Sequence, residues 1–491
     1  MTVHIGADRT GTIGPVPRRL FGSFAEHMGR GIYTGIYEPG HPGADAHGFR
    51  QDVLELVREL GPTVVRYPGG NFVSSYRWED GVGPSRPTRL DPAWHSVETN
   101  EFGLHEFMAW ARFAGVEPMY AVNLGTRGIQ EAADVLEYCN HPGGTTLSER
   151  RRDNGAESPF DIRLWCLGNE MDGPWQVGHK TADEYGRLAA ETARLMRMID
   201  PRVELVVAGS SGADMPTFGQ WERTVLTHTA HLVDHLSLHA YYQEHDGDVA
   251  AYLASSAALD GYIRATAGII EDTLAELGLD KRIGISVDEW NVWDQRRWNE
   301  DDQPRLRSGP WTRHPRIIED TYTVTDAVVV GSLLSSLLRN VDRVSMANLA
   351  QLVNVIAPIR AEPGGAAWRQ TTFHPFQLVT RYARGHSLVC HVDGPRIGEV
   401  DVVDVAITAD GPSYAVFLTN RDTISETEVR ITIDDTLTVH EAVTITPQAS
   451  RHETSVEPRP LSSVDVKAGT VTATLPPLSW SMLRLTGGAD A

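Results

Sequence analysis

The stretch RLWCLGNE at residues 163–170 decides the fold, because it places an acidic residue at the end of a buried strand. Its apolar run, 164–167, is too short for a helix and dense enough in large side chains for a strand that is buried on both faces. Glu170 therefore emerges at the carboxyl end of a strand, where barrel enzymes carry their catalytic groups. A second stretch, IGISVDEWNVW at 283–293, has the same form, and its apolar run ends on an Asp-Glu pair that contains Glu289. A fold must bring these two glutamates together for them to act as one site.

Eight strand-like runs alternate with helical periodicity, which is the pattern of βα units. The clearest helix, 181–199, begins with a capping box formed by Thr181 and Glu184 and repeats apolar residues at intervals of three and four. Eight such units predict an α/β protein with a (β/α)8 barrel and several long loops, the longest at 291–315. The expected strands are 20–24, 63–66, 118–123, 163–168, 204–208, 236–240, 283–287 and 343–347.

The pattern changes near residue 380. Beyond it, short runs of alternating apolar and polar residues are separated by Gly, Pro, Asp and Asn, which predicts a β-sandwich. A strand-like stretch at the start of the chain, with Val3 and Ile5 in alternation, is expected to join a domain that is completed elsewhere. No low-complexity linker separates the two parts, so we expect them to pack tightly.

Composition limits the classes of partner. The chain has 491 residues, with 44 Lys or Arg against 65 Asp or Glu and a formal net charge of −21. This charge repels nucleic acid and anionic membranes, so we expect neither as a partner and expect a neutral substrate. The three cysteines have no CxxC spacing, which argues against disulfides and thiolate zinc and favours a reducing compartment. No secretory signal is visible, and the longest apolar stretch, 327–338, is too short to span a bilayer, so we predict a cytoplasmic protein.

The residues beside the two glutamates suit the cleavage of a sugar. Hydrolysis of a glycosidic bond needs a proton donor for the leaving oxygen and a carboxylate that faces the oxocarbenium-like centre, and it needs no metal or other cofactor. Indole rings cover the apolar faces of sugars. The alternative on pattern alone is that the acidic pairs occupy turns and that the tryptophans belong to the core. The neighbours of Glu170 are Asn169, Trp175 and Gln176, and those of Glu289 are Asp288, Trp290, Asn291 and Trp293.

Eight longer motifs follow one another along the predicted barrel, and their combination is highly specific. They are FGSFAEHMGRGIY (21–33), GIYEPG (35–40), VRYPGGNFVSSYRWEDGVGP (65–84), ETNEFG (98–103), WCLGNEMDGPWQ (165–176), SLHAYY (237–242), DEWNVW (288–293) and NLAQLVN (348–354). Together they resemble the α-L-arabinofuranosidases of glycoside hydrolase family 51.

The resemblance implies a fold and an activity. The fold is a TIM barrel over residues 19–378 and a jelly-roll-like β-sandwich built from 1–18 plus 379–491. The activity is exo-acting and retaining: terminal non-reducing α-L-arabinofuranosyl residues are hydrolysed from arabinan or arabinoxylan oligosaccharides by double displacement through a covalent glycosyl-enzyme. The resemblance also implies a homo-oligomer, commonly a hexamer.

The family's roles carry over to the matching positions. Glu170 is implied as the general acid/base and Glu289 as the nucleophile. Two carboxylates about 5 Å apart push one pKa up, and burial adds to this, so Glu170 is expected to stay protonated while Glu289 is ionised. Tyr241 matches the phenol beside the nucleophile, although pattern alone does not separate it from Tyr242. The implied substrate-binding residues are Glu26, Asn71, Asn169, His239, Tyr241 and Gln351.

Two places depart from the family pattern. The first is Leu104-His105, and the second is the charged segment 294–302. Because of this second departure, the resemblance does not fix which linkage the enzyme prefers. Trp298 and Trp311 in this loop are interpreted either as leaving-group subsites or as part of an oligomer interface. Two rival functions stay open, another barrel glycosidase such as a β-xylosidase or endoglucanase, and a non-catalytic sugar-binding barrel. The second is disfavoured because binding alone needs no second buried carboxylate.

Overall fold

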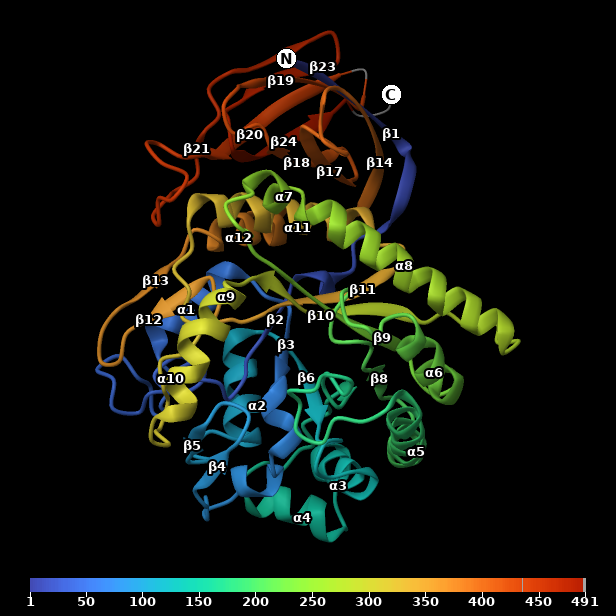
Figure 1. The fold of residues 1–491 in the computed structure, drawn as a ribbon, viewed down its shortest axis with the longest axis vertical. Coiled ribbons are helices and arrows are strands. Elements are labelled where there is room, and N and C mark those ends of the chain that lie inside the picture. The colour runs from blue at the N-terminus through green and yellow to red at the C-terminus, as the bar shows by residue number, and fades with distance from the viewer. Residues whose placement is uncertain (435, 489–491) are drawn as a thin grey trace.

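Eight parallel strands close into a barrel in the order β10-β11-β2-β3-β6-β7-β8-β9 in the computed structural model, which describes residues 1–434 and 436–488 (Figure 1). Each predicted run overlaps one of these strands, so the predicted α/β barrel is confirmed. The short strands form from the apolar runs because both of their faces are buried, one by the barrel interior and one by the surrounding helices. The barrel strands are β2 (Gly22–Phe24), β3 (Val64–Tyr67), β6 (Glu117–Val122), β7 (Leu164–Leu167), β8 (Glu204–Val207), β9 (His235–Tyr242), β10 (Gly284–Val292) and β11 (Val344–Leu349).

Helices follow the strands and cover the barrel. Helix α5 begins at the predicted capping box: the Glu184 carboxylate accepts a hydrogen bond from the Thr181 backbone N–H at 3.0 Å, and the Thr181 hydroxyl accepts one from the Glu184 N–H at 3.4 Å. No helix in the described part of the chain combines the length and apolar character needed to cross a membrane. The covering helices are α1 (Gln51–Leu60), α2 (Leu104–Ala114), α3 (Ile129–Asn140), α4 (Thr146–Asp153), α5 (Ala182–Ile199), α6 (Gln220–Thr229), α7 (Val249–Leu253), α8 (Ser255–Glu276), α11 (Val324–Arg339) and α12 (Phe373–Tyr382).

Strand β10 is longer than its predicted apolar run and contains the Asp-Glu pair. From Ser286 to Glu289 it advances three residues, whereas the paired segment of β9 advances only two, from Ser237 to His239. The extra residue is a β-bulge, which interrupts the alternation of side chains between the two faces of a strand. Asp288 and Glu289, although adjacent in sequence, can therefore both reach the same group of site residues.

The segment 291–315 is more ordered than the long loop that the sequence predicts. Its charged residues form α9 (Gln295–Arg297), a π-helical turn η4 (Trp298–Asp302) and α10 (Gln303–Ser308). The Asp294 carboxylate starts the first of these turns by accepting from the Arg297 N–H at 3.0 Å. The predicted long connection therefore contains short helical turns, which could not be predicted because their charged residues give no apolar periodicity.

Ten of the remaining strands form a sheet in the order β21-β20-β24-β18-β17-β14-β1-β19-β23-β22, which lies above the barrel in Figure 1. Val416 of β18 and Val471 of β23 are five strands apart in this order, yet they belong to one buried cluster, so the sheet folds over itself as a sandwich. Its strands are β1 (Thr2–Pro15), β14 (His386–Asp393), β17 (Val403–Asp410), β18 (Ser413–Asn420), β19 (Thr427–Thr432), β20 (Leu437–Ile445), β21 (Arg459–Pro460), β22 (Val464–Lys467), β23 (Thr470–Leu475) and β24 (Ser479–Gly487).

The first strand completes this sheet. β1 pairs antiparallel with β14 and parallel with β19, so the start of the chain lies inside a sheet formed by its last quarter. The predicted sandwich with an N-terminal strand is therefore confirmed.

Helix α11 lies between the barrel and the sheet. Trp480 of β24 covers it so closely that a Cβ atom added at Gly331 would lie 2.2 Å from the indole. Arg339, at the end of α11, pairs with Asp260 of α8 at 2.9 Å and with Asp404 of β17 at 2.8 Å. The tight packing that we expect from the absence of a linker is thus observed.

Candidate active site

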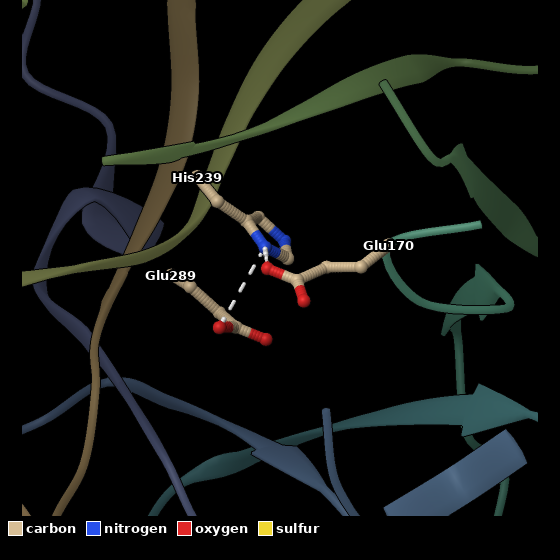
Figure 2. Close-up of side chains that lie close together, drawn as sticks. All are labelled: Glu170, His239 and Glu289. Atoms are coloured by element: carbon tan, nitrogen blue, oxygen red, sulfur yellow. Dashed lines mark hydrogen bonds and ion pairs between the residues drawn. The ribbon is translucent and has the colours of Figure 1, made fainter. Parts of the chain in front are cut away.

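Glu170, from the turn after β7, converges with His239 of β9 and Glu289 of β10 (Figure 2). One carboxylate oxygen of Glu170, one carboxylate oxygen of Glu289 and one ring nitrogen of His239 all lie within 4.8 Å of one another. The two glutamates are 8% and 6% exposed. Retaining glycosidases hold their two carboxyl groups about 5–5.5 Å apart, whereas inverting enzymes leave about 6.5–9.5 Å for a water molecule. The spacing fits direct attack by one carboxylate.

Both oxygens of Glu289 are held. Arg66 Nη1 donates to Oε1 at 2.7 Å, and the Tyr241 hydroxyl donates to Oε2 at 2.8 Å. Tyr241 is thus the tyrosine beside this carboxylate, whereas Tyr242 lines a neighbouring cavity with the side chain of Trp293. A buried arginine stabilises an ionised carboxylate strongly because little water competes for it.

Glu170 lies in a different environment. Its Oε1 is 2.8 Å from His239 Nδ1, and its Oε2 accepts a hydrogen bond from Trp175 Nε1 at 2.6 Å. Burial raises the pKa of Glu170, and the charge of Glu289 adds to this effect, although the bonds from His239 and Trp175 oppose it. The pKa of Glu170 is therefore higher than that of an exposed glutamate, as a proton donor requires.

His239 links the acidic groups to one another. Its Nε2 is 3.0 Å from Asp288 Oδ1, and its Nδ1 is 3.6 Å from Glu289 Oε2 as well as close to Glu170. Burial opposes a charged imidazole, but the charges of Glu289 and Asp288 outweigh it and raise the pKa of His239 well above its usual value. Glu170, His239 and Glu289 could also ligate a metal ion, since their donor atoms are close enough.

Glu26 forms the opposite wall of the site. Its Oε1 accepts from the Phe72 N–H at 2.9 Å and from Trp94 Nε1 at 3.0 Å, and its Oε2 accepts from Gln351 Nε2 at 3.0 Å. Burial, followed by the charge of Glu289, raises the pKa of Glu26 to about 8. The site therefore contains a second carboxyl group that favours its neutral form.

The PGGN turn after β3 brings the backbone against these carboxylates. A Cβ atom at Gly70 would lie 3.1 Å from Glu26 Oε2 and 3.1 Å from Glu289 Oε1, a fit that favours glycine. The next residue, Asn71, accepts a hydrogen bond from Asn169 Nδ2 at 3.3 Å. The structure thus brings all eight residues singled out from the sequence into one group.

Sequence reasoning missed the part played by Arg66. Its Nη2 donates to Asn169 Oδ1 at 2.7 Å while Nη1 holds Glu289, so one guanidinium connects the ends of two distant strands. The sequence feature that could have indicated this role is a charged residue inside the otherwise apolar strand β3. In the structure Arg66 is only 1% exposed. A buried arginine needs a carboxylate partner, and its presence in a barrel strand indicates one nearby.

The two tryptophans of the 291–315 segment occupy different places. Trp298 is buried and packs edge-on against Trp94 at 5.8 Å, directly behind the residue that bonds Glu26. Trp311 is partly exposed and stacks on His95 at 4.0 Å. Trp298 therefore supports the wall of the site, and only Trp311 presents its ring at the surface.

Comparison with known proteins identifies the family of the chain. Family models described as α-L-arabinofuranosidase 1 domain and α-L-arabinofuranosidase C-terminal domain match residues 56–258 and 288–479. An intracellular exo-α-(1→5)-L-arabinofuranosidase of Streptomyces lividans is 52% identical over 98% of this chain and 75% of its own length. An exo-α-(1→6)-L-arabinofuranosidase of Bifidobacterium longum is 50% identical over 96% of this chain and 95% of its own length.

A solved structure extends the agreement to the fold. AbfB, a family 51 α-L-arabinofuranosidase from Bifidobacterium longum, superposes with a TM-score of 0.94 at 44% identity, over 98% of this chain and 99% of the other. Sequence, fold and the paired carboxylates lead to one conclusion: the chain belongs to the α-L-arabinofuranosidases of glycoside hydrolase family 51.

Proposed function

We propose that this protein is an exo-acting, retaining α-L-arabinofuranosidase that removes terminal non-reducing α-L-arabinofuranosyl residues from oligosaccharides. The observation that carries the proposal is the close approach of Glu170, with its raised pKa, to Glu289, whose oxygens are held by Arg66 and Tyr241. The relatives from Streptomyces lividans and Bifidobacterium longum, both named exo-arabinofuranosidases, support it.

In the first step Glu289 attacks the anomeric carbon and Glu170 donates its proton to the leaving oxygen. Arg66 and Tyr241 aim the attacking carboxylate. The glycosidic C–O bond breaks as the new ester bond to Glu289 forms, and the leaving alcohol departs with the proton from Glu170.

In the second step water releases the sugar. Once Glu289 is esterified it has no charge, so one of the causes that raises the pKa of Glu170 disappears. The pKa of Glu170 then falls, and the residue can take a proton from the attacking water. The ester bond breaks, and the configuration of the anomeric carbon is retained after two inversions.

Asn169 is assigned to the hydroxyl next to the anomeric carbon. Arg66 has only N–H donors, so its 2.7 Å contact fixes the oxygen of the Asn169 amide toward the guanidinium. The amide NH2 group then faces Asn71 and the space beside Glu289. A hydrogen bond from this position strengthens as positive charge develops on the sugar. Further contacts with the furanose hydroxyl groups are assigned to Glu26, Asn71, His239 and Gln351.

Azide rescue tests the two roles. Glu289→Ala should abolish turnover, and azide should restore part of it with a product of inverted configuration. Glu170→Ala should still cleave substrates with very good leaving groups, because these need little protonation. Identical behaviour of the two variants toward activated substrates and azide would show that the roles are wrongly assigned.

A panel of nitrophenyl glycosides separates the rival glycosidases. Faster turnover of a β-xyloside or of a cellulosic substrate than of the α-L-arabinofuranoside would reject the proposed specificity. The relatives are named for (1→5) and (1→6) linkages. A product profile on linear arabinan and branched arabinoxylan oligosaccharides therefore identifies the linkage that this chain prefers.

Further proposals concern organisation and location. We assign catalysis to a domain over residues 19–378 and assign 1–18 plus 379–491 to the sandwich. The protein is proposed to act in the cytoplasm, and this is supported by the relative from Streptomyces lividans, which is named an intracellular enzyme. It is proposed to form a homo-oligomer, a hexamer, with a neutral sugar substrate and with neither nucleic acid nor a membrane as a partner.

A further inference from the structure

The turn after β7 holds Glu170 in an unfavourable backbone conformation. Glu170 has a φ of +44°, in the left-handed region that residues other than glycine rarely adopt. The turn closes when the Gly173 N–H donates to the Glu170 carbonyl at 2.9 Å. Such a conformation persists only where the surrounding structure fixes it.

Asp172, inside this turn, makes the contacts that fix it. Its side chain is buried, and both of its oxygens face the segment 208–219 between β8 and α6. Oδ2 accepts from the Thr217 hydroxyl at 2.5 Å and from the Ser210 hydroxyl at 2.7 Å. Oδ1 accepts from the Ser211 N–H at 3.0 Å and also from the Ser211 hydroxyl. One carboxylate thus gathers four donors from three residues of a neighbouring loop.

The loop that supplies these donors is itself anchored to helix α6. Glu222, near the start of that helix, accepts from the Ser210 N–H at 2.8 Å and from the Gly219 N–H at 2.7 Å. A continuous chain of hydrogen bonds therefore runs from α6 through Glu222 and Ser210 to Asp172, two residues after Glu170. None of these bonds is to Glu289 or His239, the other groups at the centre of the site.

We propose that Asp172 is a positioning residue for the acid/base: its four hydrogen bonds hold the turn that keeps the Glu170 carboxyl group in contact with His239 and Trp175. The inference rests on the proposed function, because it presupposes that Glu170 is the proton donor. Without this anchor the turn relaxes toward a right-handed conformation, and the Glu170 carboxyl moves away from the position in which it is 2.8 Å from His239 Nδ1. The contacts of Glu289 with Arg66 and Tyr241 are unaffected.

The test compares leaving groups. In Asp172→Asn the carboxylate charge is lost. The amide oxygen can still accept from Ser211, but the NH2 group keeps its contacts with Ser210 and Thr217 only if both hydroxyl groups turn to accept, so the charge-assisted bonds that hold the turn become weaker neutral ones. We expect kcat/KM to fall about 10- to 100-fold for an arabinofuranosyl disaccharide, part of the 10²–10⁴ that general acid catalysis contributes, and to change about threefold or less for a dinitrophenyl arabinofuranoside. Thr217→Val removes one donor with little change of shape and should show a smaller loss of the same selectivity. It carries the test if Asp172→Asn does not fold.

A matched control separates positioning from general destabilisation. Asp260 is also a buried aspartate with several donors, since it accepts from Ser336, Asn340 and Arg339 between α8 and α11. Asp260→Asn should lower thermal stability without selectivity between leaving groups. Equal losses on both substrates in Asp172→Asn, or a pattern like that of Asp260→Asn, would overturn the inference.

The kinetics of Glu170→Ala separate a failure of the proposed catalytic role of Glu170 from a failure of the proposed positioning role of Asp172. If Glu170→Ala shows no selectivity between leaving groups, the proposed role of Glu170 fails. If Glu170→Ala shows it and Asp172→Asn does not, the role of Glu170 stands and only the role of Asp172 is rejected.

Discussion

Replacing Arg66 by lysine tests whether catalysis depends on one guanidinium that joins two strands. Arg66 donates to Glu289 at 2.7 Å through one nitrogen and to Asn169 at 2.7 Å through another. A lysine keeps the positive charge but presents a single ammonium group on a flexible stem, so it cannot reproduce both contacts with the same geometry. We expect Arg66→Lys to lose one of them.

The size of the effect follows from the bond that is lost. A hydrogen bond to a charged group contributes about 1.5–3 kcal/mol. At 1.36 kcal/mol for each factor of ten, kcat/KM should fall about 10- to 160-fold. Arg66→Met also removes the charge and leaves His239 as the remaining cationic partner of Glu289 and Asp288, and breaking a buried ion pair in this way costs about 3–5 kcal/mol. In that variant both contacts are lost, so kcat/KM should fall further than in Arg66→Lys.

The assay is kcat/KM on a nitrophenyl α-L-arabinofuranoside, measured across pH and combined with thermal unfolding. Arg50 is a suitable control because it is fully buried and pairs with Asp52 at 2.7 Å outside the site. Arg50→Lys should lower stability and leave kcat/KM nearly unchanged. Activity of Arg66→Lys within about threefold of the wild type would refute the reasoning, since that is under 0.7 kcal/mol.

Three further predictions address the site and the interface. Tyr241→Phe should lower kcat about 10- to 100-fold through loss of its 2.8 Å bond to the nucleophile, whereas Tyr242→Phe should not; steady-state kinetics on both variants checks this. The pKa of Glu26 is raised from 4.5 to about 8, so the folded protein binds a proton that the unfolded chain releases, and the free energy of unfolding should decrease as pH rises through this range. Urea unfolding at several pH values should show the slope, and Glu26→Gln should flatten it. Gly331→Ala would place a methyl group 2.2 Å from the Trp480 ring and should destabilise the protein by about 1–3 kcal/mol. Calorimetry measures this effect, and an unchanged Tm would contradict the described packing.

Buried apolar runs were sufficient to locate the barrel strands. The run 164–167 coincides with β7 because every one of its side chains is buried. The far end of β10 was not predictable in the same way, since Asp288 and Glu289 interrupt the apolar pattern while the strand continues to Val292. Polar residues that point into a site resemble the residues that end a strand, and only the pairing with β9 distinguishes the two.

The site could be predicted only in part for a related reason. Motifs identified the glutamates and the residues beside them, because these lie close together in short stretches. The connections made by Arg66 and Asp172 join segments that are distant in sequence, and no local spacing encodes them. A charged residue within a buried strand was the one available signal for Arg66. Asp172 gave none, since an aspartate after a strand is also an ordinary turn residue.

The place of β1 in the sheet has a consequence for how the protein is made. Residues 2–15 leave the ribosome hundreds of residues before their hydrogen-bonding partners at 386–393 and 427–432. Until then the nascent chain carries a strand with two unsatisfied edges, a feature that invites aggregation. A gene cut after the barrel would leave this strand permanently unpaired, so shortening the protein to its barrel calls for removing both ends together.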